Sequence, residues 1–273
     1  MSELGPSNNR EKPTTFFTLS LRLGVSAVIL AAAAAAQIVQ PLGSLEVSGR
    51  VKIDGKQEKL SRKRFYLIRG GLAENKALVD RLGTAHIESR DCFYSRVEAS
   101  PEFICWLRAE NCESPYCRDI SAEDIERVPE FLTAYQKGMI QFRKRGAFAI
   151  DWLTTKLPPV LSSGYYRMRR SHTDTLLGDI KPLQSSMTDS VTVKSIFIDI
   201  PLVNGTGEKF LVTNILPIEF GGKSYLWACE VEIGAAKPAS LRLLVPEGGK
   251  PVKNCEVWVK ELPVCTTEAC NKT

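Results

Sequence analysis

Eight cysteines constrain the fold of this 273-residue chain more than any other residue type. An even number of cysteines in an exported protein predicts a disulfide framework, because thiols outside the cytoplasm are readily oxidised. Zinc ligands and free buried thiols are the alternatives, but Cys112-x4-Cys117 and Cys265-x4-Cys270 lack the usual C-x2-C spacing of a zinc site. The disulfide candidates are Cys92, Cys105, Cys112, Cys117, Cys229, Cys255, Cys265 and Cys270.

The N-terminal segment predicts the compartment that these cysteines meet. Basic residues precede an apolar run from Leu23 to Ala36, which ends in small side chains. This layout is typical of a secretory signal peptide, whereas a membrane anchor over residues 16–39 needs about 20 apolar residues. Residues 1–36 are therefore predicted to be a signal peptide or a membrane anchor, with a buried helix of a soluble protein as the third interpretation. Export to the periplasm, the cell envelope or the extracellular space follows from the first two.

The charge balance argues against one class of partner. The chain has 36 Lys and Arg residues against 31 Asp and Glu residues, which gives a net charge of +5. This mild excess does not resemble the concentrated basic surface of a nucleic-acid-binding protein. We expect no nucleic acid among the partners.

Strand patterns lie at both ends of the exported part. Residues 45–53 alternate apolar and polar side chains, residues 63–68 form a second apolar segment, and Asp54-Gly55 between them is a strong turn signal. From Ser190 onward, β-branched segments separated by Gly and Pro predict further strands at regular spacing. These five segments are residues 191–200, 209–220, 223–233, 240–245 and 255–262.

The central region is predicted to be mostly helical. Ser100 and Pro101 have the N-cap and N1 positions of a helix over residues 101–111. Ser121 and Asp124 resemble a capping box with Asp in place of Glu, and Pro129 is expected to kink or shorten the helix that follows. Further helical segments are predicted at residues 72–82, 147–156 and 173–177.

The first strands resemble a known family. The residues that carry the resemblance are Gly49-Arg50-Val51, Asp54-Gly55-Lys56, Leu60 and Phe65-Tyr66-Leu67. Residues 47–69 thereby resemble the carboxypeptidase regulatory-like, or transthyretin-like, β-sandwich family. The resemblance implies a β-sandwich, although in that family the next strands usually follow at once. Here residues 70–189 intervene.

These patterns together predict an α+β fold. We expect a seven-stranded β-sandwich, made of two N-terminal and five C-terminal strands, with a mostly helical, cysteine-bearing insertion. The alternative is a hairpin on an independent helical domain, followed by a separate five-stranded domain. The predicted boundaries are a signal or anchor over 1–36, a linker over 37–45, the sandwich over 46–69 and 190–265, the insertion over 70–189 and a tail over 266–273.

The predicted fold suggests local disulfide pairs. Cys229 and Cys255 fall on neighbouring predicted strands, and Cys265 and Cys270 are close enough to close a loop in the tail. The four cysteines within residues 92–117 are expected to pair among themselves. Eight cysteines allow 105 connectivities, so these pairs are hypotheses.

No segment carries a recognisable catalytic motif. G-x-S-x-G, H-E-x-x-H and a phosphate-binding glycine loop are absent, and His86 and His172 stand alone. We predict no catalytic residue, no cofactor and no metal. Two basic clusters stand out instead, residues 62–64 and a larger contact patch beside a tyrosine pair. The candidate patch consists of Arg143, Lys144, Arg145, Tyr165, Tyr166, Arg167, Arg169 and Arg170.

The sequence therefore favours an exported, disulfide-stabilised, non-enzymatic binding or accessory protein of the cell envelope. Its expected partner is a protein or an envelope component, and membrane association through residues 16–39 is an open alternative to free secretion. We expect the helical insertion to carry the contacts, because insertions vary freely on a fixed scaffold. A subunit of a membrane protein complex and an exported enzyme of unrecognised type are the other two hypotheses.

Overall fold

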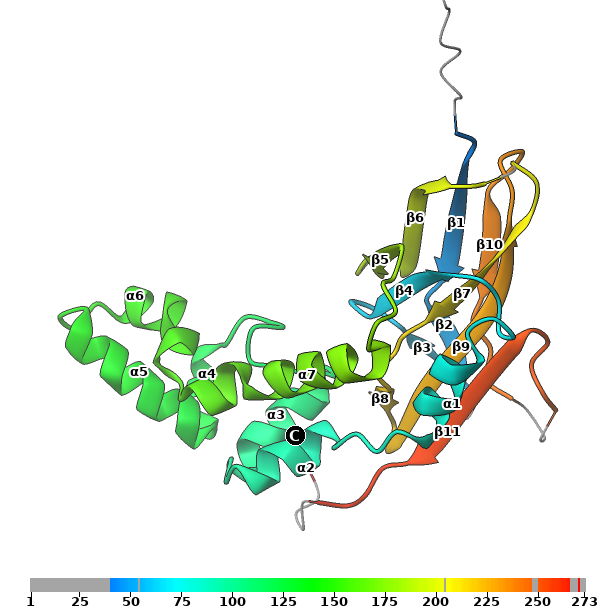
Figure 1. The fold of residues 1–273 in the computed structure, drawn as a ribbon. Coiled ribbons are helices and arrows are strands. Elements are labelled where there is room, and N and C mark those ends of the chain that lie inside the picture. Colours follow the sequence, from blue (N-terminus) through cyan, green and yellow to red (C-terminus); the bar gives the residue numbers. More distant parts are fainter. Residues whose placement is uncertain (1–39, 54, 204, 247–249, 266–269, 271–273) are drawn as a thin grey trace, which may run out of the picture. The chain divides into compact units, whose positions relative to one another are not determined.

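The computed structural model describes residues 40–273 except 54, 204, 247–249, 266–269 and 271–273 (Figure 1). The predicted signal peptide or anchor over residues 1–36 thus lies outside the described residues. Within the described part of the chain, no helix is long and apolar enough to cross a bilayer. The fold is α+β, as predicted, with helices concentrated between two groups of strands.

The N-terminal half runs from strands into helices. The strands are β1 (Leu42–Ser48), β2 (Arg50–Ile53), β3 (Lys56–Lys59) and β4 (Arg64–Arg69). The α-helices are α1 (Lys76–Thr84), α2 (Arg90–Arg96), α3 (Pro101–Ala109), α4 (Ala122–Arg127), α5 (Pro129–Gln141), α6 (Gly146–Asp151) and α7 (Tyr165–Leu177). A 3-10 turn (Leu153–Lys156) and a π turn (Val160–Gly164) separate α6 from α7.

The C-terminal half is made of strands. These are β5 (Gln184–Met187), β6 (Lys194–Pro201), β7 (Glu208–Thr213), β8 (Ile218–Phe220), β9 (Lys223–Ile233), β10 (Ala239–Arg242) and β11 (Cys255–Glu261). The larger sheet has the order β11-β9-β7-β4-β5, with β8 also paired to β9. The smaller sheet has the order β10-β1-β6, and β2 and β3 form a separate hairpin.

The predicted seven-stranded sandwich is wrong in its strand count, because the described residues form eleven strands in three sheets. The predicted strand over residues 45–53 is two strands that meet at Gly49. The Gly49 N–H donates to the Val193 carbonyl oxygen at 2.7 Å, and a Cβ at position 49 would collide with that oxygen. The chain turns here, so β1 and β2 join different sheets.

Three further corrections concern the boundaries. The predicted linker over residues 37–45 includes the start of β1, where Leu42 is already paired with Pro201 of β6. The predicted strand over 209–220 is divided into β7 and β8. The short strands β3 and β5 were not expected, because neither has an alternating apolar pattern.

The two larger sheets share one hydrophobic core. Their facing side chains include Leu45 and Val47 of β1, Phe197 of β6 and Trp227 of β9, all at most 1% exposed. The other face of the larger sheet packs against α1 and the end of α7, where Leu82 and other apolar side chains cover it. Strand β9 is therefore buried on both faces over six consecutive residues. This explains why it reads as a continuous apolar run rather than an alternating one.

The remaining helices have a second core of their own, which includes Phe103, Trp106 and Phe131. Ser100 caps α3 as predicted, since its hydroxyl accepts the Phe103 N–H at 3.1 Å. The capping box at the start of α4 is confirmed as well. A proline at position 129 starts α5 instead of kinking a longer helix, because its missing N–H costs nothing at a helix N-terminus.

The chain leaves the larger sheet at β4, forms the helical segment and returns to the sheet at the neighbouring strand β5. These two strands pair antiparallel with Arg64 opposite Met187. The predicted insertion over residues 70–189 therefore includes one strand of the sheet.

All eight cysteines form disulfides: Cys92–Cys265, Cys105–Cys270, Cys112–Cys117 and Cys229–Cys255. The predicted bridge between Cys229 and Cys255 is confirmed, because these residues face each other across β9 and β11.

The predicted pair Cys265–Cys270 is wrong, and Cys92 and Cys105 do not pair within residues 92–117. The chain after β11 instead reaches the helices, where the Ser95 hydroxyl donates to the Cys265 carbonyl oxygen at 2.9 Å. Two disulfides thereby bind the C-terminal segment to α2 and α3.

Candidate ligand-binding groove

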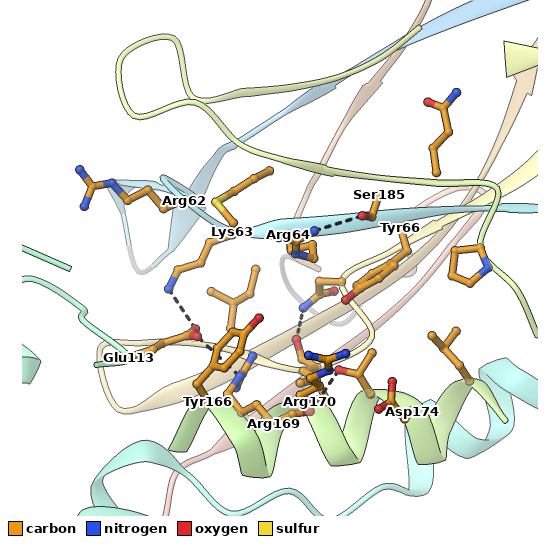
Figure 2. A pocket seen from close by; sticks show the side chains of 18 of the residues that line it. Arg62, Lys63, Arg64, Tyr66, Glu113, Tyr166, Arg169, Arg170, Asp174 and Ser185 are labelled. Carbon is orange, nitrogen blue, oxygen red and sulfur yellow. Dashed lines mark hydrogen bonds and ion pairs between the residues drawn. The ribbon is translucent and has the colours of Figure 1, made fainter. Parts of the chain in front are cut away.

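A polar groove lies where α7 meets the β4–β5 edge of the larger sheet. Its volume is about 620 Å³. In Figure 2, Arg64, Tyr66 and Ser185 come from the strands, and Tyr166, Arg169, Arg170 and Asp174 come from the helix. The groove therefore forms only when the helical segment docks on the sheet. We refer to it below as the basic groove.

The basic groove carries an excess of positive charge. Five cationic side chains line it against two carboxylates, those of Glu113 and Asp174, which leaves three positive charges unbalanced. The cations are Arg62, Lys63, Arg64, Arg169 and Arg170. Arg62, Arg64 and Arg170 are exposed.

Glu113 forms an ion pair with each of the two inner cations. Its carboxylate lies 3.4 Å from Lys63 Nζ and 3.6 Å from Arg169 Nε (Figure 2). Burial opposes ionisation of this carboxyl, but the positive charges of Arg169 and Lys63 prevail and lower the pKa of Glu113 to about 2. Glu113 is therefore a carboxylate at any physiological pH.

A buried polar network continues behind Glu113. Arg169 Nη1 donates to the Tyr165 hydroxyl at 3.3 Å, and Tyr165 donates to a Glu219 carboxylate oxygen at 3.2 Å. The backbone N–H of Arg90 donates to the same oxygen at 3.1 Å. Burial raises the pKa values of Tyr165 and Glu219, so the phenol remains a neutral donor. This network joins α2 and α7 to β8.

Arg169 is fixed on the sheet side as well. Its Nη2 donates to the Pro217 carbonyl oxygen at 3.1 Å. Burial disfavours the charged guanidinium, but the neighbouring Glu113 outweighs this and raises the pKa of Arg169. Arg169 is thus a structural cation, whereas the exposed arginines of the groove have unused N–H donors.

A second cavity of about 670 Å³ continues the groove toward the β2–β3 hairpin. Both cavities are lined by Arg62, Lys63, Glu113 and Tyr166. The Tyr166 ring is 60% exposed at their junction. The pair of cavities has room for an extended ligand that passes over an aromatic surface.

The predicted contact patch is not one surface. Tyr166, Arg169 and Arg170 line the basic groove, whereas Tyr165 is buried behind it and bonded to Arg169. Arg167 lies on α7 outside the groove lining and donates to the Pro159 carbonyl oxygen at 3.4 Å. The remaining three residues, Arg143, Lys144 and Arg145, lie at the α5–α6 turn and do not line the groove.

The structure instead joins the two basic clusters that the sequence separates. Residues 62–64 and residues 169–170 are about a hundred positions apart but line the same cavity. Sequence reasoning missed Glu113, which follows Cys112 inside the short Cys112–Cys117 loop. The position of Glu113 between two closely spaced cysteines is a sequence signal that could have indicated a carboxylate held in a fixed place.

The described residues contain no cluster of three or more His, Cys, Asp or Glu side chains placed to hold a metal ion. The eight cysteines are all oxidised to disulfides and therefore are not available as thiolate nucleophiles. His86 is exposed in the loop after α1, and His172 is half-buried on α7.

Comparisons of the chain with protein-family models, curated protein sequences and solved structures find no match. The resemblance of residues 47–69 to the carboxypeptidase regulatory-like family stays a prediction.

Proposed function

We propose that this chain is an exported binding protein of the cell envelope and that its basic groove takes a carboxylate-rich segment of a protein partner. The observation that carries the proposal is the excess of exposed guanidinium groups around a cavity of about 620 Å³. Four disulfides support a site of action in an oxidising compartment.

Guanidinium groups suit this ligand because their N–H donors match the two oxygens of a carboxylate. Arg64 uses one donor on the Ser185 hydroxyl, at 3.1 Å, and Arg62 uses one on the Cys117 carbonyl oxygen. Each retains further donors, since a guanidinium has five. The inner cations, Lys63 and Arg169, are already ion-paired with Glu113. The outer arginines are therefore the ones that meet the ligand.

The dimensions favour a peptide segment over a small ion. The two joined cavities are each within the range of roughly 300–1,000 Å³ that is typical of ligand sites. Tyr166 between them offers a flat amphipathic contact, as tyrosines do in many protein interfaces. An isolated anion would occupy only a small part of this space.

The test is titration calorimetry of the full chain with a synthetic oligo-glutamate peptide. The variant R64A/R170A should lose affinity by roughly a hundred-fold, because it removes two charge-assisted contacts. The matched control is R50A/R242A, which removes two exposed arginines from β2 and β10, outside the groove. The control should bind like the parent.

Two results would contradict the proposal. Equal weakening of both variants would mean that the peptide responds only to net charge. Inorganic phosphate that displaces the peptide at equal concentration would point to a small-anion site instead.

A further inference from the structure

The α5–α6 hairpin and the residue that follows it carry three exposed apolar side chains that do not line the basic groove. Ile140 is 82% exposed, Trp152 is 53% exposed and Phe148 is 47% exposed. The three side chains come from the end of α5, from α6 and from the residue that follows α6. Figure 1 shows the α5–α6 hairpin at the end of the helical region, away from the strands. We refer to residues 137–156 as the helical tip.

All the charged side chains of the helical tip are cationic except that of Asp151. The cations are Lys137, Arg143, Lys144, Arg145 and Lys156. Two of them lie over exposed or half-buried rings, with Arg145 5.9 Å from the Phe148 centroid and Lys156 6.0 Å from the Phe142 centroid. Cationic and apolar side chains thus alternate within this hairpin, and two cation–ring contacts join them.

The backbone holds this surface in place. Arg143 and Lys144 have φ values of 51° and 64°, in the left-handed region that β-carbon-bearing residues rarely adopt. The Lys144 N–H donates to the Met139 carbonyl oxygen at 2.7 Å, which closes the turn. Gly138 lets the two helices meet closely, because a Cβ there would lie 3.1 Å from the Ala149 Cα. The tip is a built feature of the hairpin rather than a loose loop.

We infer that the helical tip is a peripheral binding site for an anionic lipid bilayer. Cations attract the acidic headgroups, while Trp, Phe and Ile side chains enter the boundary between headgroups and acyl chains. A purely acidic, polar peptide would pair with the cations but would not bury the isoleucine, which is 82% exposed. The combination of cations with exposed apolar side chains in one hairpin therefore favours an anionic membrane over an acidic peptide as the occupant.

Trp152 makes the inference testable in the full chain. The other three tryptophans are Trp106, Trp227 and Trp258, and the first two are buried at 3% and 0% exposure. Residues 1–39 contain no tryptophan, so an N-terminal segment that inserts into lipid would not contribute to the signal. The probe is quenching of tryptophan fluorescence by brominated phosphatidylglycerol in phosphatidylcholine vesicles.

We expect quenching in the parent chain and its loss in W152F, which keeps an aromatic ring but removes the reporter. The variant R143Q/K144Q/R145Q should lower the ratio of vesicle-bound to free protein by roughly a hundred-fold, because each cation near an anionic surface contributes to binding. The matched control R50Q/K52Q/R242Q removes the same residue types from β2 and β10 and should bind like the parent.

The inference is overturned by any of three results. The first is a parent chain whose Trp152 is not quenched on anionic vesicles. The second is equal quenching on vesicles of brominated phosphatidylcholine alone. The third is a blue shift of Trp152 fluorescence with oligo-glutamate but not with vesicles, which would assign the tip to an acidic protein.

Discussion

The stabilising effects of the two long-range disulfides should overlap. Removing both should therefore lower the free energy of unfolding by more than twice the loss that follows from removing either one. Cys92–Cys265 closes 173 residues and Cys105–Cys270 closes 165. The two bridges run side by side along the chain. With one intact, the loop closed by the other runs from 92 to 105 and from 270 back to 265, roughly 18 residues.

Chain entropy gives the magnitudes. Closing roughly 18 residues stabilises by about 3 kcal/mol, whereas closing roughly 170 stabilises by about 5 kcal/mol. The pair variants C92A/C265A and C105A/C270A should therefore each lose about 3 kcal/mol of unfolding free energy. The quadruple variant should lose about 8 kcal/mol, since its second deletion opens the long loop.

Urea unfolding of the oxidised proteins, followed by circular dichroism, measures these losses. The control is C112A/C117A, whose separation of five residues predicts about 2 kcal/mol whether or not the other bridges are present. A loss of about 5 kcal/mol from a single pair variant would refute the shared-loop argument. So would a quadruple variant that loses only the sum of the two pair variants.

Two other changes test the groove and the core. Because the pKa of Glu113 is lowered to about 2, its stabilising contribution should be complete above its ordinary pKa and disappear as pH falls toward 2. The difference in unfolding free energy between the parent and E113Q, measured from urea midpoints, should therefore shrink as pH is lowered toward 2. A difference that stays constant with pH would show that the ionisation of Glu113 is not coupled to folding. W227A should lose about 3–5 kcal/mol, since Trp227 is 0% exposed between the sheets and its Nε1 donates to the Leu244 carbonyl oxygen at 2.7 Å. A loss below about 1 kcal/mol in calorimetry would contradict that packing.

Local signals predicted local structure well. Ser100 and Ser121 marked helix starts because an N-cap depends on side chains within a few residues. The apolar segments that became β4, β6 and β9 were recognisable for the same reason, since burial leaves a pattern along the strand itself. Strand β5 was missed because four largely polar residues at a sheet edge carry no such pattern.

The basic groove required the folded chain. Arg64 and Arg170 belong to clusters that the sequence shows separately, and only the docking of α7 beside β4 brings them to one cavity. Glu113 gave no signal as a groove residue, because its role depends on Lys63 and Arg169 from distant elements. Charge clusters are visible in a sequence, but their mutual distances are not.

The sequence by itself indicated the α+β class and the formation of disulfides, and it suggested the bridge between Cys229 and Cys255, because adjacent antiparallel strands place such cysteines opposite each other. Only the tertiary structure decided the partners of Cys92 and Cys105, since pairing across more than 160 residues depends on where the C-terminal segment lies. The same holds for the basic groove and the helical tip. Both are surfaces, and a surface is a property of packed elements rather than of any one stretch of chain.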